Sequence, residues 1–181
     1  MSRFIMQLGS GLSSELCSNV INRIDRDEML YRGLVATGLD SIRKDSLDLD
    51  LTDRSDWIDV VTALRTSLGR SLQLYADANP SIGSIARLGC HSFRLRKYPS
   101  SGGFDWHIDC YDAKVATRVI SCVWYLNDVF QGGQTEFLYQ GASIGCRVGT
   151  VLMFPASFEY VHRSSPCTTP KYVAVGFLEH F

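Results

Sequence analysis

The sequence predicts one domain of mainly β structure, an antiparallel β-sandwich or jelly roll with helices packed outside it. Its 181 residues suit a single domain, and its 45% hydrophobic and 20% charged residues are typical of a globular protein. Helical patterns fill the first 80 residues, and short strand-like runs follow after residue 85. We therefore expect a helical N-terminal support over roughly 1–80 and a β core over roughly 85–181, within a single domain that spans 1–181.

Two helical patterns define the N-terminal part. Over residues 12–24, leucine, valine and isoleucine recur at the spacing of one helix face, and Ser13 or Ser14 is suited to cap the helix. A longer apolar stripe covers residues 57–75, with Ser55 as a suitable N-cap and an Asn-Pro pair to end the helix. Both helices have an apolar face, so we expect both to pack on the β core.

Residues 30–54, between the two helices, show no clear period. Their stretch DSLDLDLTDRSD predicts an edge strand or a mobile loop. Long irregular stretches in compact domains are often functional, so residues 27–54 are also a candidate lid or substrate loop. In that case Arg43 and Lys44 would contact an acidic group of a substrate. A solvated polar loop without a function is an equally good interpretation of this segment.

Six strand-like runs separated by turn-rich stretches make up the rest of the chain. They are HSFRLRKY, RVISCVWYL, TEFLY, GTVLMFP, EYVH and KYVAVGFLEHF. In the first run, Arg94, Arg96 and Lys97 form a short basic cluster, which we expect to be a solvated face. Many short strands after two helices indicate antiparallel rather than parallel pairing.

Charge and composition narrow the class of protein. The net charge of -1 gives no general attraction to nucleic acid or to an anionic membrane, and no apolar run approaches the length of a membrane span. The first residues lack the apolar core of a signal peptide, so we expect a cytoplasmic protein. The six cysteines are scattered without a CxxC pair, which favours free, mostly buried thiols over a zinc or redox motif.

The stretch FDWHIDC, residues 104–110, is the first candidate for chemistry. On a strand, His107 and Asp109 would project to one face and could ligate one ion, although Asp105 has the same parity and most such pairs are surface polar residues. A jelly roll can bring the distant His162 beside them. Two histidines and one aspartate form a facial triad typical of non-haem Fe(II) oxygenases, but a zinc hydrolase uses the same ligand types.

Lys171 is the second candidate. It lies nine residues after His162, where the apolar run KYVAVGFLEHF begins. A lysine in such a run rarely points inward unless it is paired with an anion, and here it could meet the far carboxylate of a dicarboxylic acid chelated at the metal. The alternative is a solvated lysine at a strand edge.

Six blocks between Tyr98 and the C-terminus occur in an order and at spacings that identify a protein family more specifically than any single block does. They are KYPSSGGFDWHID, RVISCVWYLND, GGQTEF, GTVLMFP, VHRSSP and PKYVAVGF. Together they resemble the Fe(II)/2-oxoglutarate-dependent dioxygenases, specifically the prolyl 4-hydroxylase-like branch. The resemblance implies a double-stranded β-helix (jelly roll/cupin-like) core. It also implies an enzyme that hydroxylates an unactivated C–H of an amino acid, a peptidyl residue or a small metabolite, while 2-oxoglutarate and O2 become succinate and CO2.

The resemblance also implies roles for individual residues. His107, Asp109 and His162 would be the catalytic Fe(II) ligands. Lys171 would bind the C5 carboxylate of 2-oxoglutarate, and Tyr98 would hydrogen-bond the same co-substrate. Without the family, Tyr98 would be read as a packed strand tyrosine.

Two further positions match the family and one departs from it. Thr135 would belong to the co-substrate pocket, and Arg118 would face the substrate. Without the family resemblance, Arg118 would be expected to be a surface arginine on a strand. Halogenating relatives have a small residue at the position of Asp109, so its carboxylate argues against that activity. Phe177 stands where the prolyl hydroxylases have tryptophan, which casts doubt on a prolyl peptide as substrate.

Three alternatives remain at this point. The same site could act on a nucleic-acid base, although the chain shows no strong basic stripe. The fold could belong to a non-catalytic jelly-roll binding protein, or to a cupin-type zinc hydrolase. We expect a small-molecule or peptidyl substrate, no nucleic acid and no membrane as partner, and we leave the oligomeric state open.

Overall fold

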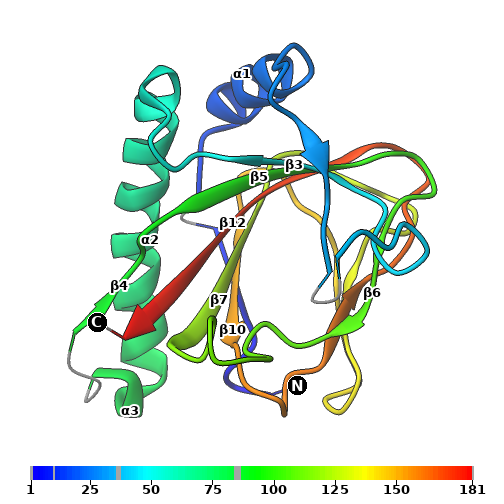
Figure 1. The fold of residues 1–181 in the computed structure, drawn as a ribbon. Helices are drawn as coiled ribbons and strands as arrows, with labels where there is room; N and C mark the ends of the chain where they lie inside the picture. Colours follow the sequence, from blue (N-terminus) through cyan, green and yellow to red (C-terminus); the bar gives the residue numbers. More distant parts are fainter. Residues whose placement is uncertain (1, 10, 36–37, 84–86, 181) are drawn as a thin grey trace.

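Two antiparallel sheets form the body of the protein, with helices along one side of the larger sheet (Figure 1). This computed structural model describes residues 2–9, 11–35, 38–83 and 87–180. The predicted fold class is confirmed, since the described chain is mainly antiparallel β structure with few helices. None of the helices in the described ranges is both long and apolar enough to cross a membrane.

The larger sheet contains eight strands. Their order is β1 (Met6–Leu8), β10 (Val151–Pro155), β7 (Arg118–Tyr125), β12 (Lys171–His180), β5 (Phe93–Tyr98), β3 (Leu47–Asp50) and β2 (Tyr31–Arg32), and β4 (Leu88–Gly89) also pairs with β12. Strand β12 is central, because β5 and β7 flank it along most of its length. Three strands of this sheet come from the N-terminal part, which is therefore more than the helical support that the sequence predicts.

The smaller sheet contains four strands and carries the residues of greatest chemical interest. Its order is β6 (Phe104–His107), β11 (His162–Ser164), β8 (Thr135–Phe137) and β9 (Ala142–Ile144). A second hydrophobic core lies between the two sheets. It joins Phe137 and Ile144 of the smaller sheet to Tyr125, Phe154 and Val173 of the larger one. Both sheets are thus held against each other by side chains that alternate inward along each strand.

The helices cover the outer face of the larger sheet. Helix α1 (Ser14–Ile24) has the predicted cap, since Leu16 N donates to Ser13 Oγ at 3.2 Å. Helix α2 (Ile58–Ala78) packs its apolar stripe on the sheet, where Trp124 Nε1 donates to Ser67 Oγ at 2.8 Å. The short helix α3 (Pro80–Gly83) follows.

The expected cap at Ser55 is wrong. Residues Ser55–Trp57 form a single 3-10 turn, η1, and α2 begins only at Ile58, without a side-chain cap. The tighter turn lets Trp57 bury its ring in the core while its Nε1 donates to Asp27 Oδ2 at 3.0 Å. Packing of the tryptophan therefore sets the start of this helix.

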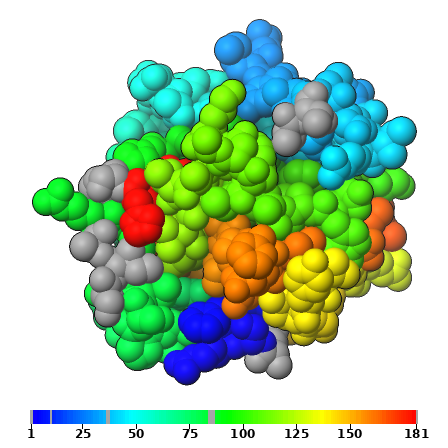
Figure 2. Space-filling view, turned by 60° about the horizontal axis from the view of Figure 1, so that its bottom comes forward, coloured from blue at the N-terminus to red at the C-terminus, as the bar shows by residue number. Residues whose placement is uncertain are grey.

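The N-terminal segment closes one end of the molecule. Strand β1 pairs with β10, Ser2 Oγ lies 3.3 Å from Tyr160 Oη, and Arg3 Nη2 donates to Ala78 O at 2.6 Å. In the space-filling view the segment (blue) lies between the end of α2 (green) and the turn before β11 (orange) (Figure 2). Both sheets and the long helix are therefore tied together at this end.

The stretch DSLDLDLTDRSD, residues 45–56, does not form the edge strand that the sequence predicts; its residues Leu47–Asp50 form strand β3. Strand β3 is an interior strand, hydrogen-bonded to β2 on one side and to β5 on the other. Its alternating sequence LDLD puts Leu49 into the core beneath the helices and directs Asp48 and Asp50 to the opposite face. There the two aspartates meet Arg96 and Arg94 of β5. At β3, the alternation reflects one apolar face and one ionic face.

Candidate metal centre

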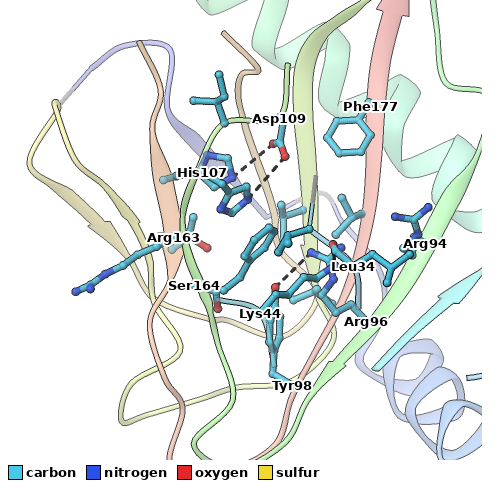
Figure 3. A pocket seen from close by; sticks show the side chains of 18 of the residues that line it. Leu34, Lys44, Arg94, Arg96, Tyr98, His107, Asp109, Arg163, Ser164 and Phe177 are labelled. Atoms are coloured by element: carbon cyan, nitrogen blue, oxygen red, sulfur yellow. Dashed lines mark hydrogen bonds and ion pairs between the residues drawn. The ribbon is translucent and has the colours of Figure 1, made fainter. Parts of the chain in front are cut away.

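Three potential metal ligands converge where the two strands β6 and β11 meet. His107, the last residue of β6, pairs directly with His162, the first residue of β11. The Nε2 atoms of His107 and His162 lie 3.8 and 3.5 Å from the two carboxylate oxygens of Asp109 (Figure 3). One ligand atom from each of the three residues lies within 4.8 Å of the others. The structure therefore brings together the three residues that the sequence predicts as ligands.

The reason for the convergence differs from the predicted one. Strand β6 ends at His107, and Asp109 follows in a bend, so strand parity does not direct its carboxylate. The exposed Asp105 is not part of the cluster; its backbone oxygen lies 2.7 Å from His107 Nδ1. The end of the strand gives Asp109 the freedom to turn toward both imidazoles.

Backbone and side-chain contacts orient all three ligands. His162 Nδ1 lies 2.9 Å from Tyr160 O, as His107 Nδ1 does from Asp105 O. With Nδ1 donating to a carbonyl, the Nε2 lone pair of each ring faces the cluster. Ser121 Oγ donates to Asp109 Oδ2 at 2.6 Å. Ser121 is a positioning residue that no sequence pattern marks, because it is a small residue within the apolar run RVISCVWYL.

The electrostatics of the cluster favour a bound cation. Burial, together with the neighbouring His162, lowers the pKa of His107 to about 3, so this imidazole is neutral at pH 7. Burial opposes ionisation of Asp109, but His162, His107 and the Ser121 hydrogen bond outweigh it and lower the pKa of the carboxyl group. Imidazole ligands must be neutral and the carboxylate ionised to bind a metal. Two imidazoles and one carboxylate on one side of an open cavity fit Fe(II).

A cavity of about 350 Å³ opens on this cluster and contains Lys171. Lys171 is only 2% exposed, so the alternative of a solvated strand-edge lysine is wrong. Its Nζ donates to Gly133 O at 2.6 Å and to Ser164 Oγ at 2.8 Å, and no carboxylate among the described residues pairs with it. Burial lowers the pKa of this amine. A buried ammonium with only neutral partners is suited to bind an incoming anion.

Tyr98 and Thr135 lie around Lys171. Tyr98 is directly opposite Lys171 in the pairing of β5 with β12, and the Lys171 Nζ lies 5.3 Å from the centre of its ring. The hydroxyl of Thr135 lies 2.7 Å from Tyr125 Oη. Both residues are buried and line the cavity, as predicted for a co-substrate pocket. Their contact with a co-substrate stays a prediction.

Arg118 also lines the cavity, at the side of Asp109. Its Nη1 donates to the Asp109 backbone oxygen at 3.0 Å, and its Cζ lies 3.7 Å from the centre of the Phe177 ring. Its Nε lies 3.5 Å from Glu179 Oε1. Arg118 is therefore held beside a ligand and is not the surface arginine of the alternative interpretation. All seven predicted site residues line one cavity.

The basic residues of β5 and of the preceding segment correct two expectations. Arg96 is not on a solvated face: it is mostly buried, and its guanidinium pairs with Asp48 at 2.8 Å. Lys44 does contact an acidic group, but this group is the protein's own Asp48, at 2.9 Å. Arg43 is exposed at the cavity. The sequence signal for these ion pairs is the alternation LDLD in β3 and RLRK in β5. It predicts the pairs only when β3 and β5 are known to be neighbouring strands.

Comparison with protein families gives an independent result. Residues 93–179 match the family model described as the 2OG-Fe(II) oxygenase superfamily. No curated protein shows a significant sequence match to the chain. The family match covers the predicted triad, Lys171 and the other predicted site residues, and it confirms the family resemblance. With the His-Asp-His cluster it supports the predicted Fe(II), 2-oxoglutarate and O2.

Solved structures with the same fold are distant in sequence. A Trichoplax adhaerens prolyl hydroxylase in complex with a hypoxia inducible factor oxygen degradation domain peptide aligns with a TM-score of 0.81 and 17% identity, over 98% of this chain and 84% of that chain. The viral collagen prolyl hydroxylase of Paramecium Bursaria Chlorella virus-1 gives 0.72 and 15%, over 98% and 97%. A Pseudomonas putida prolyl-4-hydroxylase gives 0.68 and 17%, over 98% and 93%. These likenesses confirm the jelly-roll fold.

Proposed function

Since residues 93–179 belong to the 2OG-Fe(II) oxygenase superfamily, we propose that this 2-oxoglutarate-dependent enzyme hydroxylates an unactivated C–H of an amino acid, a peptidyl residue or a small metabolite. The chemistry supplied by bound Fe(II) is the reductive activation of O2, by which 2-oxoglutarate becomes succinate and CO2. One oxygen atom enters succinate, and the other converts the substrate C–H to C–OH. The family match supports the reaction class, and the geometry below supports the roles of individual residues.

The observation that carries this proposal is the buried Lys171 in the same cavity as the triad. Its ammonium is desolvated and has no acidic partner among the described residues. Such a group does not stabilise the fold, because burying an unpaired charge costs on the order of several kcal/mol. A dicarboxylate that reaches from the metal ligands to Lys171 supplies the missing anion. A monodentate substrate for a zinc hydrolase would leave Lys171 without a role.

The remaining residues have roles that follow from their contacts. His107 presents a neutral imidazole, His162 is oriented by the backbone oxygen of Tyr160, and Asp109 presents an ionised carboxylate held by Ser121. Tyr98 and Thr135 are buried in the wall of the cavity that contains Lys171, where their hydroxyl groups are available to a co-substrate. The protein thus contributes the orientation of the reacting groups.

A peptidyl substrate is supported by two structural neighbours, a prolyl hydroxylase in complex with a peptide and a viral collagen prolyl hydroxylase. Phe177 weakens the case for proline itself. Its ring packs beneath the Arg118 guanidinium and has no N–H with which to hydrogen-bond a peptide. A free amino acid or another small metabolite is therefore part of the same proposal.

Turnover of 2-oxoglutarate tests the proposal. Purified protein is supplied with Fe(II), 2-oxoglutarate and O2, and succinate is measured with and without each member of a panel of amino acids, small carboxylic acids and proline-containing peptides. We expect at least one compound to raise succinate release and to gain the mass of one oxygen atom. The His107→Ala variant should show neither effect. Succinate release no greater than that of His107→Ala with every compound would contradict the proposal.

A further inference from the structure

The cavity is strongly cationic beyond its metal centre. Seven arginine and lysine residues line it, and Asp109 is its one acidic lining residue within the described chain. Four carboxylates behind the wall offset part of this charge, but Lys44 and Arg96 share a single aspartate, Asp48. Lys171 has no acidic partner in the described chain, nor has Arg43. Positive charge therefore remains after every ion pair is counted.

The co-substrate would neutralise positive charge at only one end of the cavity, the end that contains Lys171. Tyr98, Arg96 and Arg94 alternate along the inner face of β5, opposite Lys171, Val173 and Val175 of β12. Four residues along a strand correspond to roughly 13 Å, so Arg94 lies about that far along the strands from the Tyr98–Lys171 pair. A five-carbon acid bound at Lys171 does not reach Arg94.

Arg94 has hydrogen-bonding capacity that the protein does not use. One guanidinium nitrogen, Nη2, donates to Asp50 Oδ2 at 3.1 Å. Its Nε is buried and has no hydrogen-bond partner, and the same is true of Arg118 Nε. Figure 3 shows Arg94 on the same side of the cavity as Phe177, away from Tyr98. Leaving a buried N–H unpaired costs free energy, so an oxygen ligand at this end would relieve a cost already present.

The wall between the two ends is apolar. Val173 and Val175 of β12 and Val123 of β7 line the cavity next to Arg94, with Phe177 beyond them. These side chains suit an aliphatic group and leave no hydrogen-bonding partner for a polar one. The His-Asp-His cluster belongs to the other sheet and opens on the same cavity. An aliphatic chain on this wall lies within the cavity that the metal ligands share.

We propose that the primary substrate is a small carboxylic acid with an aliphatic body, and that Arg94 binds its carboxylate. The Arg94 Nε donates to the carboxylate, and the valine wall holds the aliphatic part. This inference rests on the proposed function, since it concerns the second substrate of the same site. It narrows the substrate from any amino acid, peptide or metabolite to an organic anion, for which Arg94 is a specificity-determining residue.

Binding of simple fragments tests the assignment without knowledge of the natural substrate. The enzyme is loaded anaerobically with Fe(II) and saturating 2-oxoglutarate, so that Lys171 is occupied, and hexanoate, hexanamide and hexyl phosphate are titrated by calorimetry. We expect hexanoate to bind about tenfold or more tightly than hexanamide, which corresponds to about 1.4 kcal/mol. Arg94→Gln should abolish this preference while the affinity for 2-oxoglutarate stays unchanged. Arg70→Gln, on the exposed face of α2, is the matched control.

Each outcome decides a separate point. Equal binding of hexanoate and hexanamide, or no binding of either, would overturn the proposal, as would a hexanoate preference that survives in Arg94→Gln. Tighter binding of hexyl phosphate would overturn the carboxylate assignment. Failure of 2-oxoglutarate itself to bind would instead contradict the proposed function. If Arg94→Gln does not fold, Arg94→Lys keeps the charge without the Nε donor, and we expect it to lose at least half of the preference; full retention would contradict the role of Nε.

Discussion

Replacing Ser121 with alanine should weaken Fe(II) binding about 10–100-fold without unfolding the protein. Ser121 is fully buried in β7, and its Oγ donates to Asp109 Oδ2 at 2.6 Å. A hydrogen bond to a charged group contributes about 1.5–3 kcal/mol, and about 1.4 kcal/mol corresponds to a factor of ten in affinity. The outer contacts of metal ligands show a similar range of about 10–100-fold. The alanine removes this contact and leaves only a small void.

Anaerobic competition with a chromophoric chelator measures the affinity for Fe(II). Ser121→Thr keeps a hydroxyl group at this position and should retain affinity nearer to the wild type, provided that its extra methyl group is accommodated. Ser143→Ala, at an exposed position of β9, is the control and should leave the affinity unchanged. Thermal unfolding of all variants separates loss of fold from loss of metal.

Wild-type Fe(II) affinity in a folded Ser121→Ala variant would show that the hydrogen bond from Ser121 to Asp109 does not support metal binding. It would mean that the backbone around Asp109 holds the carboxylate in place without help from the serine. A loss of Fe(II) binding equal in Ser121→Ala and Ser121→Thr would also contradict the account, because it would indicate a packing defect instead of a missing hydrogen bond.

Three further predictions follow from buried charges. Lys171→Met should lower the affinity for 2-oxoglutarate at least about 100-fold in calorimetry, because a buried ion pair is lost, and should leave Fe(II) binding unchanged. The control Lys114→Met, at an exposed position, should change neither affinity. Equal 2-oxoglutarate affinity in the two variants would contradict the role of Lys171. Asp48→Asn should destabilise the protein by about 3–5 kcal/mol in urea unfolding, because Lys44 and Arg96 lose their shared anion, and a cost below about 1 kcal/mol would contradict this. Burial opposes ionisation of Asp48, but Arg96 and Lys44 outweigh it and hold its pKa well below the usual value, so its contribution to stability is complete above about pH 4 and is lost as the pH falls through the folded-state pKa. Wild-type stability should therefore fall more steeply than that of Asp48→Asn below pH 4, and parallel curves would contradict the assignment.

The long elements and the metal ligands were predictable from the sequence because each has a local signal. Helix α1 has its serine cap, β7, β10 and β12 are runs rich in apolar and β-branched residues, and β5 alternates apolar with basic residues. His162 could be selected because the chain has few histidines and one stands in a distant strand-like run. Strands such as β2 and β4 have only two residues each, too few to show a period.

The remaining features depend on tertiary contacts that no local pattern encodes. Trp57 packs into the core and moves the start of α2 past Ser55. Asp48 stabilises Arg96 in the cavity wall, although each residue alone has the character of a solvated one. Ser121 acts on Asp109 across twelve residues, so the partner becomes visible only in the folded chain. Ionic and outer-ligand contacts were therefore missed for the same physical reason: their partners are distant in sequence.

The most direct test of the central claim is an anaerobic absorption spectrum of metal-free protein to which Fe(II) and then 2-oxoglutarate are added. We expect a weak visible charge-transfer band that requires both additions and is absent in a folded His162→Ala variant. Such a band would establish the chelate and its distal ligand together. No band in well-folded wild-type protein, or an equal band in His162→Ala, would contradict the claim that His107, Asp109 and His162 hold iron for a 2-oxoglutarate-dependent reaction.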